Sequence, residues 1–171
     1  MADAPRPTAD ELEELALILR RDPASPAFVD LAQAFLALGR PREAIDAATA
    51  GLRHSPDNHD GRLALARGHA ALHQWKEAQA ELLRVVKVDR TSKLGFTLLG
   101  EVLMRRADYE RATPVLQHAQ NLDPSNPAVL ALLRAARSGA QLDPPAPIPT
   151  PIAPRRAEPR ARPAPSARWG R

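Results

Sequence analysis

The sequence contains no cysteine, which excludes disulfide bonds, a catalytic thiol and a cysteine-ligated metal. It also has no long apolar segment, because no uncharged stretch approaches the ~18 residues that a membrane-spanning helix needs. The first residues show no basic start followed by an apolar run, so we expect no secretory signal. These absences predict a cytoplasmic protein without membrane insertion.

The residue sets that carry catalysis are missing as well. The sequence holds no glycine-rich phosphate motif and no recognisable pairing of a nucleophile with a base. His69 and His73 have the spacing of two zinc ligands on one helix face, but no third ligand lies near them in sequence. We therefore expect no catalytic residue, no cofactor and no metal site, and we expect that the protein is not an enzyme.

Aromatic residues make up only 4% of the chain, whereas Ala, Leu, Arg and Glu, which favour helices, are abundant. A pattern of small and apolar residues recurs every 34 positions. The pair Leu31-Ala32 recurs as Leu65-Ala66 and Leu99-Gly100, and Ala44 recurs as Ala78 and Ala112. A fixed repeat of this length predicts helical hairpins that stack around one elongated core.

The pattern predicts an all-α chain in which three helix-turn-helix repeats lie between two further helices. The expected boundaries are 8–21 for the N-terminal helix, 25–58, 59–92 and 93–126 for the repeats, and 127–138 for a capping helix. Thr8 and Glu11 have the spacing of a capping box. Arg134 stands where each repeat has Ala or Gly, and its size prevents another helix from packing there, so helix 127–138 ends the stack. Residues 1–7 are expected to be disordered.

These recurring residues together resemble the tetratricopeptide repeat (TPR) family over residues 25–126. The resemblance rests on Leu31, Ala32, Phe35, Gly39, Ala44, Pro56, Leu65, Ala66, Ala78, Leu99, Gly100, Tyr109, Ala112, Ala119 and Pro124. It implies a solenoid in which small side chains lie where the two helices of a hairpin cross. Three positions depart from the pattern: His69 stands where the first repeat has Phe35, Arg90 replaces the terminal proline, and Gly51 is a weak helix former.

In the TPR family the first helix of each repeat lines a concave groove that binds a partner. The equivalent residues here are Val29, Gln33, Leu36, Leu63, Arg67, Ala70, Thr97, Glu101 and Met104. This set is mostly apolar with one cation and one anion, which fits an amphipathic helix or an extended apolar peptide. The alternative is that its apolar members only cover neighbouring helices. The family's cationic clamp for a partner's terminal carboxylate is absent, since those positions read Val29, Gln33, Ala64, Leu94 and Leu98.

Residues 139–171 form a Pro/Arg-rich tail that we expect to be disordered. Residues 144–171 carry a net charge of +5, whereas residues 1–143 carry −1. The candidate contact residues of the tail are Arg155, Arg156, Arg160, Arg162 and Trp169. Three interpretations stay open: a solvating tail without a partner, a proline-rich ligand of SH3-like domains around Pro151 to Arg156, and weak binding to a polyanion.

The leading hypothesis is a non-enzymatic adaptor that binds a partner protein as a helix or an extended peptide in the concave groove. Chaperone-like proteins and bacterial assembly, secretion or motility complexes are the settings in which such small arrays are expected. The alternative hypothesis is binding to nucleic acid or another polyanion through the tail. The sequence pattern does not indicate an oligomeric state.

Overall fold

The computed structural model describes residues 7–143, and these residues form eight helices with no strand among them. Helix α1 (Ala9–Arg21) precedes three helical hairpins, and α8 (Pro127–Ser138) follows them. The hairpins are α2 (Ala27–Ala37) with α3 (Pro41–His54), α4 (His59–Ala71) with α5 (Trp75–Val88), and α6 (Lys93–Arg105) with α7 (Tyr109–Leu122). The predicted all-α fold is therefore confirmed. Within the described range, no helix has both the length and the hydropathy to cross a membrane.

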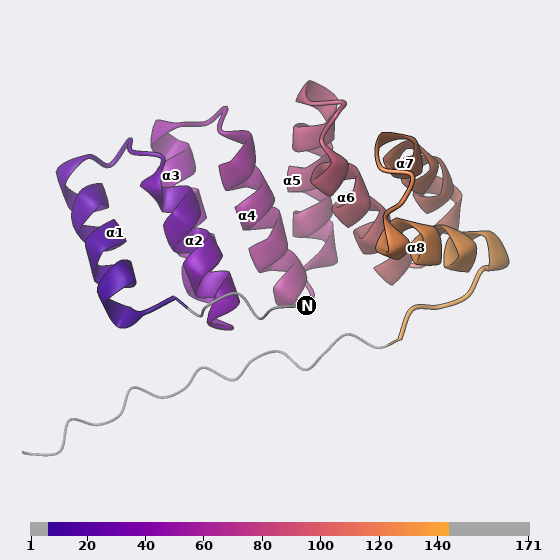
Figure 1. Ribbon diagram of the computed structural model, residues 1–171, viewed down its shortest axis with the longest axis horizontal. Helices are drawn as coiled ribbons and strands as arrows, with labels where there is room; N and C mark the ends of the chain where they lie inside the picture. Colours follow the sequence, from indigo (N-terminus) through magenta and orange to yellow (C-terminus); the bar gives the residue numbers. More distant parts are fainter. Residues whose placement is uncertain (1–6, 144–171) are drawn as a thin grey trace, which may run out of the picture.

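Helix α1, the three hairpins and α8 follow one another roughly in sequence order along the long axis of the molecule, and α2 overlaps α3 in this view (Figure 1). Each helix packs on the next one in the chain, from α1 through to α8. The helix axes also change direction along the row, so that α8 lies steeply inclined to α1 (Figure 1). This arrangement is a twisted solenoid in which every unit is supported by its neighbours.

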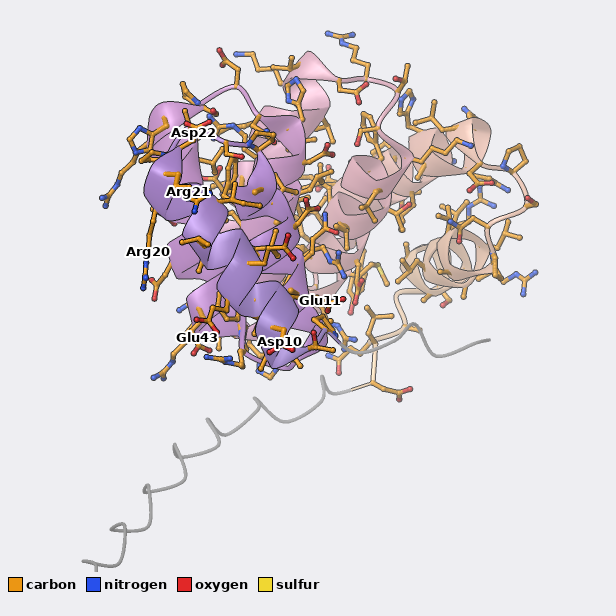
Figure 2. The ribbon with its side chains drawn as sticks, turned by 60° about the vertical axis from the view of Figure 1, so that its left-hand side comes forward. Asp10, Glu11, Arg20, Arg21, Asp22 and Glu43 are labelled. Carbon is orange, nitrogen blue, oxygen red and sulfur yellow. The ribbon has the colours of Figure 1, made fainter. Side chains whose placement is uncertain are left out.

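The first helix begins at the capping box that its sequence predicts. Thr8 Oγ1 accepts a hydrogen bond from the Glu11 amide at 3.2 Å, and the Glu11 carboxylate accepts one from the Thr8 amide at 2.7 Å. Asp10 and Glu11 lie near the N-terminal end of α1, and Arg20 and Arg21 lie near its C-terminal end (Figure 2). Both ends therefore carry the charges that a helix dipole favours.

The later helices are also delimited by their own residues. The Asp108 carboxylate caps α7 by accepting from the Arg111 amide, and Asn126 caps α8 by accepting from the Val129 amide. Helix α7 continues past Pro114 without a break, although the proline has no amide hydrogen to donate to the Glu110 carbonyl. Gly139 ends α8 in a left-handed conformation with φ 65°.

The turn inside each hairpin uses one left-handed residue at the same register position. Gly39, His73 and Ala107 are 34 residues apart and have φ angles of 68°, 59° and 57°. Only glycine adopts this region without steric cost, so the second and third hairpins hold a strained turn. His73 therefore lies beyond the end of α4 and does not share a helix face with His69.

Small residues at the crossing of the two helices bring each hairpin together. The register positions named above are all buried: Ala32, Ala44, Ala66, Ala78, Gly100 and Ala112. At the third crossing a Cβ on Gly100 would lie 2.3 Å from Leu116 Cδ2, so the leucine fills the space that the glycine leaves. Larger side chains at these positions would force the helices apart.

The interior consists of two apolar clusters that meet in α4. One joins α2, α3 and α4 around Ala32, Ala48 and Leu65, and the other runs from Leu63 to Ala136 of α8. In α4, Leu63 and Ala66 belong to one cluster and Ala64 and Leu65 to the other. This helix therefore separates the two halves of the core.

Phe28 explains the glycine at position 51. A Cβ on Gly51 would lie 2.0 Å from Phe28 Cγ, and a Cβ on Gly61 would lie 2.5 Å from Phe28 Cε2. The ring is only 1% exposed and lies against α3 and α4 at once. Gly51 is therefore required by a long-range aromatic contact, although its intrinsic helix propensity is poor.

The chain turns back onto α6 after α8. Leu142 packs against the core cluster that contains Met104, and the Arg105 guanidinium donates to the Asp143 carbonyl oxygen. Residues 140–143 thus contact the folded unit, whereas the sequence pattern assigned them to the tail. At the register position of the crossing residues, Arg134 is exposed on α8.

Candidate functional site

Helices α2, α4 and α6 are the first helices of their hairpins, and we expect them to line the inner side of the curve. Helix α2 packs on α4 as well as on α3, and α6 packs on α8 as well as on α7. Contacts between the first helices of successive units are expected on the inside of a curved stack, where these helices approach one another. We call the solvent-facing side of α2, α4 and α6 the inner face.

The nine residues predicted for this face divide by burial. Val29 and Leu63 are each 8% exposed and Met104 is 2% exposed, so these three side chains belong to the packing of the array. Leu36, Ala70, Thr97 and Glu101 are half-buried, while Gln33 and Arg67 are exposed. The expectation of a mostly apolar accessible surface was wrong, because neighbouring helices cover the largest apolar members.

One register position supplies the accessible polar groups of the inner face. Gln33, Arg67 and Glu101 are 34 residues apart on α2, α4 and α6, and we call them the polar row. They place an amide, a cation and a carboxylate in succession along the array. These groups can donate to and accept from a peptide backbone, whereas the residues at neighbouring register positions supply apolar contact.

The C-terminal end of the inner face is closed by an ion pair and by the returning chain. A guanidinium nitrogen of Arg105 lies 3.8 Å from the Glu101 carboxylate, and the same side chain holds the Asp143 carbonyl. This closure could not be read from the pattern, because Asp143 lies 38 residues from Arg105. A ligand on the polar row therefore meets a charged boundary after the third repeat.

The histidines of the second repeat have structural partners. His69 Nδ1 lies 2.7 Å from the Gln74 side-chain oxygen, and the His73 ring stacks on Trp75 with centroids 5.3 Å apart. Among the described residues, no group of three or more His, Cys, Asp or Glu side chains is arranged to hold a metal ion. The predicted tail contacts, from Arg155 to Trp169, lie outside the described residues.

Comparison with known proteins agrees with this geometry. A family model described as tetratricopeptide repeat matches residues 35–101. No curated protein sequence matches the chain.

Solved structures with the same fold include several arrays of similar size. A crystal structure of MamA superposes with a TM-score of 0.71 at 15% sequence identity, covering 75% of this chain and 76% of that one. The first TPR domain of human RPAP3 has a TM-score of 0.63 at 20% identity, covering 66% and 88%. The first TPR of Spaghetti (RPAP3), bound to the HSP90 peptide SRMEEVD, has a TM-score of 0.62 at 20% identity, covering 73% and 92%. These likenesses establish the fold.

Proposed function

Since this chain is a tetratricopeptide repeat protein in its fold and in the sequence of its central repeats, we propose that it is a non-enzymatic adaptor that binds an extended peptide of a partner protein on its inner face. The polar row of Gln33, Arg67 and Glu101 is the observation that carries the proposal. Three polar side chains at one register position are set along the array at repeat spacing.

An extended peptide fits this face better than an apolar helix does. A peptide backbone exposes donors and acceptors along its length, and the amide, cation and carboxylate of the polar row offer complementary groups. An amphipathic helix would need a wide apolar stripe, but Val29, Leu63 and Met104 are buried within the array. The half-buried Leu36 and Ala70 then provide shallow apolar contact for one or two peptide side chains.

Relatives in fold support the class of ligand and also limit it. The first TPR of Spaghetti (RPAP3) was solved with the HSP90 peptide SRMEEVD, and the second TPR domain of human RPAP3 was solved with the HSP70 peptide SGPTIEEVD. The clamp positions implied by the family resemblance hold no cation here, since they include Val29, Ala64 and Leu98. We therefore propose that this chain binds an internal peptide segment of its partner and not a terminal carboxylate.

Selection of peptides from a random library against the full chain tests the proposal. Selected peptides would be measured by calorimetry against the wild type and against the double variant Gln33→Ala/Arg67→Ala. Both side chains are exposed, so the variant retains its helicity in circular dichroism. We expect binding to weaken by about tenfold or more, since each lost hydrogen bond contributes about 1 kcal/mol and those to charged groups contribute more.

The control is Arg53→Asn, which removes an exposed charge from α3, away from the inner face. Affinity for the selected peptides should stay unchanged in this variant. Charged substitutions at Leu63 or Met104 are unsuitable, because both side chains are buried and the array would lose stability. If the selected peptides bind the Gln33→Ala/Arg67→Ala variant as tightly as the wild type, the inner face is not the site.

A further inference from the structure

A hollow at the junction of the second and third repeats contains none of the inner-face residues. It has a volume of about 550 Å³ and is lined by Leu83, Val86, Lys87, Arg90, Phe96 and His118. These residues come from α5, the loop after it, α6 and α7. Leu83 is 47% exposed, which is high for a leucine in the middle of a helix. We call this site the outer hollow.

The floor of the outer hollow is fixed in place by two contacts. The rings of Phe96 and His118 lie 4.3 Å apart between centroids and are tilted by 59°. His118 Nε2 lies 2.9 Å from the Arg90 carbonyl oxygen, to which it donates. The aromatic floor is thus held by α7 and by the loop between α5 and α6, and it is formed before any ligand arrives.

The repeats provide an internal reference for this site. Thirty-four residues earlier, Arg62 stands where Phe96 stands, and it donates to the Pro56 carbonyl at 2.6 Å and to the Glu81 carboxylate at 3.0 Å. Between the first and second repeats, this position therefore holds a charged side chain with hydrogen-bond partners, Arg62. Between the second and third repeats, the same position holds the ring of Phe96, which lines the hollow.

The rim also differs from that of the flanking repeats. Leu83 corresponds to Thr49 and Gln117, and Arg90 corresponds to Pro56 and Pro124. The second repeat therefore has an exposed leucine where the other two repeats have a polar residue, and a cation where they have a proline. Neither replacement is needed for the hairpins to pack, because the other repeats pack without them.

The charge around the outer hollow is positive. Lys87 and Arg90 are exposed on its rim, and none of its lining residues is acidic. Of the neighbouring carboxylates, Glu81 is paired with Arg62 and Arg84, whereas Asp89 accepts only from the neutral Thr91 hydroxyl and amide and keeps its negative charge beside the two cations and His118. Val88 ends α5 and Leu94 lies at the start of α6, on either side of the loop that holds Arg90, and they are 68% and 48% exposed.

We propose that the outer hollow is a second docking site, which takes an acidic peptide that inserts one large apolar side chain. Val86 and the aromatic floor receive the side chain, and Lys87 and Arg90 attract the flanking carboxylates. The volume accommodates a phenylalanine or leucine side chain together with part of its backbone. The chain's own Arg-rich tail has the wrong charge for this site.

A nucleic acid would pair its phosphates with the cations and stack a base on the aromatic floor, but it leaves the exposed Leu83 without a role. The test therefore compares three peptides of seven residues and one oligonucleotide with the ¹⁵N-labelled full chain by NMR. The first peptide has a central Phe between two Glu-Asp-Glu segments. The second replaces Phe by Ser, the third replaces every acid by its amide, and the fourth probe is a heptathymidylate.

The matched variant is Leu83→Gln/Lys87→Asn, which installs the residues found at the same register in the third repeat, Gln117 and Asn121. The control is Arg53→Asn, which removes a cation at the position of the first repeat that corresponds to Lys87. We expect the Phe peptide to shift the signals of Leu83, Phe96 and His118 and to bind the matched variant at least about tenfold more weakly. The control should bind it within about twofold of the wild type.

The second and third peptides should also bind at least about tenfold more weakly than the first, because the second lacks the apolar side chain and the third lacks the carboxylates. Equal binding of the Ser peptide or of the heptathymidylate would show a simple anion-attracting surface and would overturn the proposal. Absence of shifts at millimolar Phe peptide would overturn it as well. The variant Gln33→Ala/Arg67→Ala should leave the shifts unchanged, which separates this site from the inner face.

Discussion

Replacing Gly51 by alanine should destabilise the protein, although alanine is the better helix former. In an unhindered helix this change stabilises by about 0.8–1.0 kcal/mol. Here the new Cβ would lie 2.0 Å from Phe28 Cγ and within 2.4 Å of both Cδ atoms. Carbon atoms in contact are normally about 3.5 Å apart, so the ring or α3 must move by about 1.5 Å.

The surroundings of the ring leave little room for that movement. Phe28 is 1% exposed, and on its other side it approaches Gly61 of α4. Overpacking in a close-packed core costs about 1–3 kcal/mol, and a rigid aromatic neighbour places this case at the upper end. After subtraction of the helix-propensity gain, we expect Gly51→Ala to lower the free energy of unfolding by about 2 kcal/mol.

Urea unfolding followed by circular dichroism measures the effect. Ala50→Gly is the matched control, because Ala50 is exposed on the same helix and reports propensity alone, with an expected loss of about 1 kcal/mol. In a Phe28→Leu background the smaller side chain should reduce the cost of Gly51→Ala to below about 1 kcal/mol. A Gly51→Ala protein that is more stable than the wild type would refute the steric reasoning.

Three further outcomes are expected. Ala107→Gly should stabilise the protein by about 0.5–1 kcal/mol by relieving the left-handed turn, and Gly39→Ala should destabilise it by about 1 kcal/mol; thermal unfolding of the pair checks both signs, and a common sign would contradict the account. Hydrogen bonds from the Thr91 side chain and backbone hold the pKa of Asp89 below its ordinary value. The stability that the Asp89 carboxylate adds is therefore present above the pKa of the unfolded chain. It is lost as the pH falls through the lower pKa of the folded protein. Thr91→Ala should raise the pKa of Asp89 in an NMR titration, and an unchanged midpoint would exclude the hydroxyl as the main cause. Glu81→Gln should lower the unfolding free energy by about 1 kcal/mol in urea titrations, because the half-buried carboxylate pairs with two arginines, and a loss within error would mean that these pairs contribute nothing.

The architecture could be predicted because the residues that determine it recur locally. Ala32, Ala66 and Gly100 mark the same helix crossing at a fixed interval, and the capping residues Thr8 and Asn126 act within a few positions of themselves. Such short-range rules depend on neither the curvature of the array nor the packing between repeats. These rules can therefore be applied to the sequence alone.

The accessible surface of the inner face could not be predicted in the same way. Leu63 and Met104 occupy register positions that face inward, but their burial depends on neighbouring helices: α2, α3 and α5 pack on α4, which holds Leu63, and α7 and α8 pack on α6, which holds Met104. The outer hollow likewise requires Phe96 and His118, which are 22 residues apart in the chain, to come together across two helices. Sequence periodicity identifies the side of a helix on which a residue lies, whereas its solvent exposure depends on which other helices pack over that side.

The division of the core at α4 has a mechanical consequence. Because each half of the interior is held largely by its own contacts, α1 to α3 can detach from the rest while the second cluster remains intact. Amide exchange should therefore be slowest between α5 and α7 and faster toward the N-terminus. A partner lying along the row from α2 to α6 would bridge both halves and would act as a splint that suppresses this partial melting.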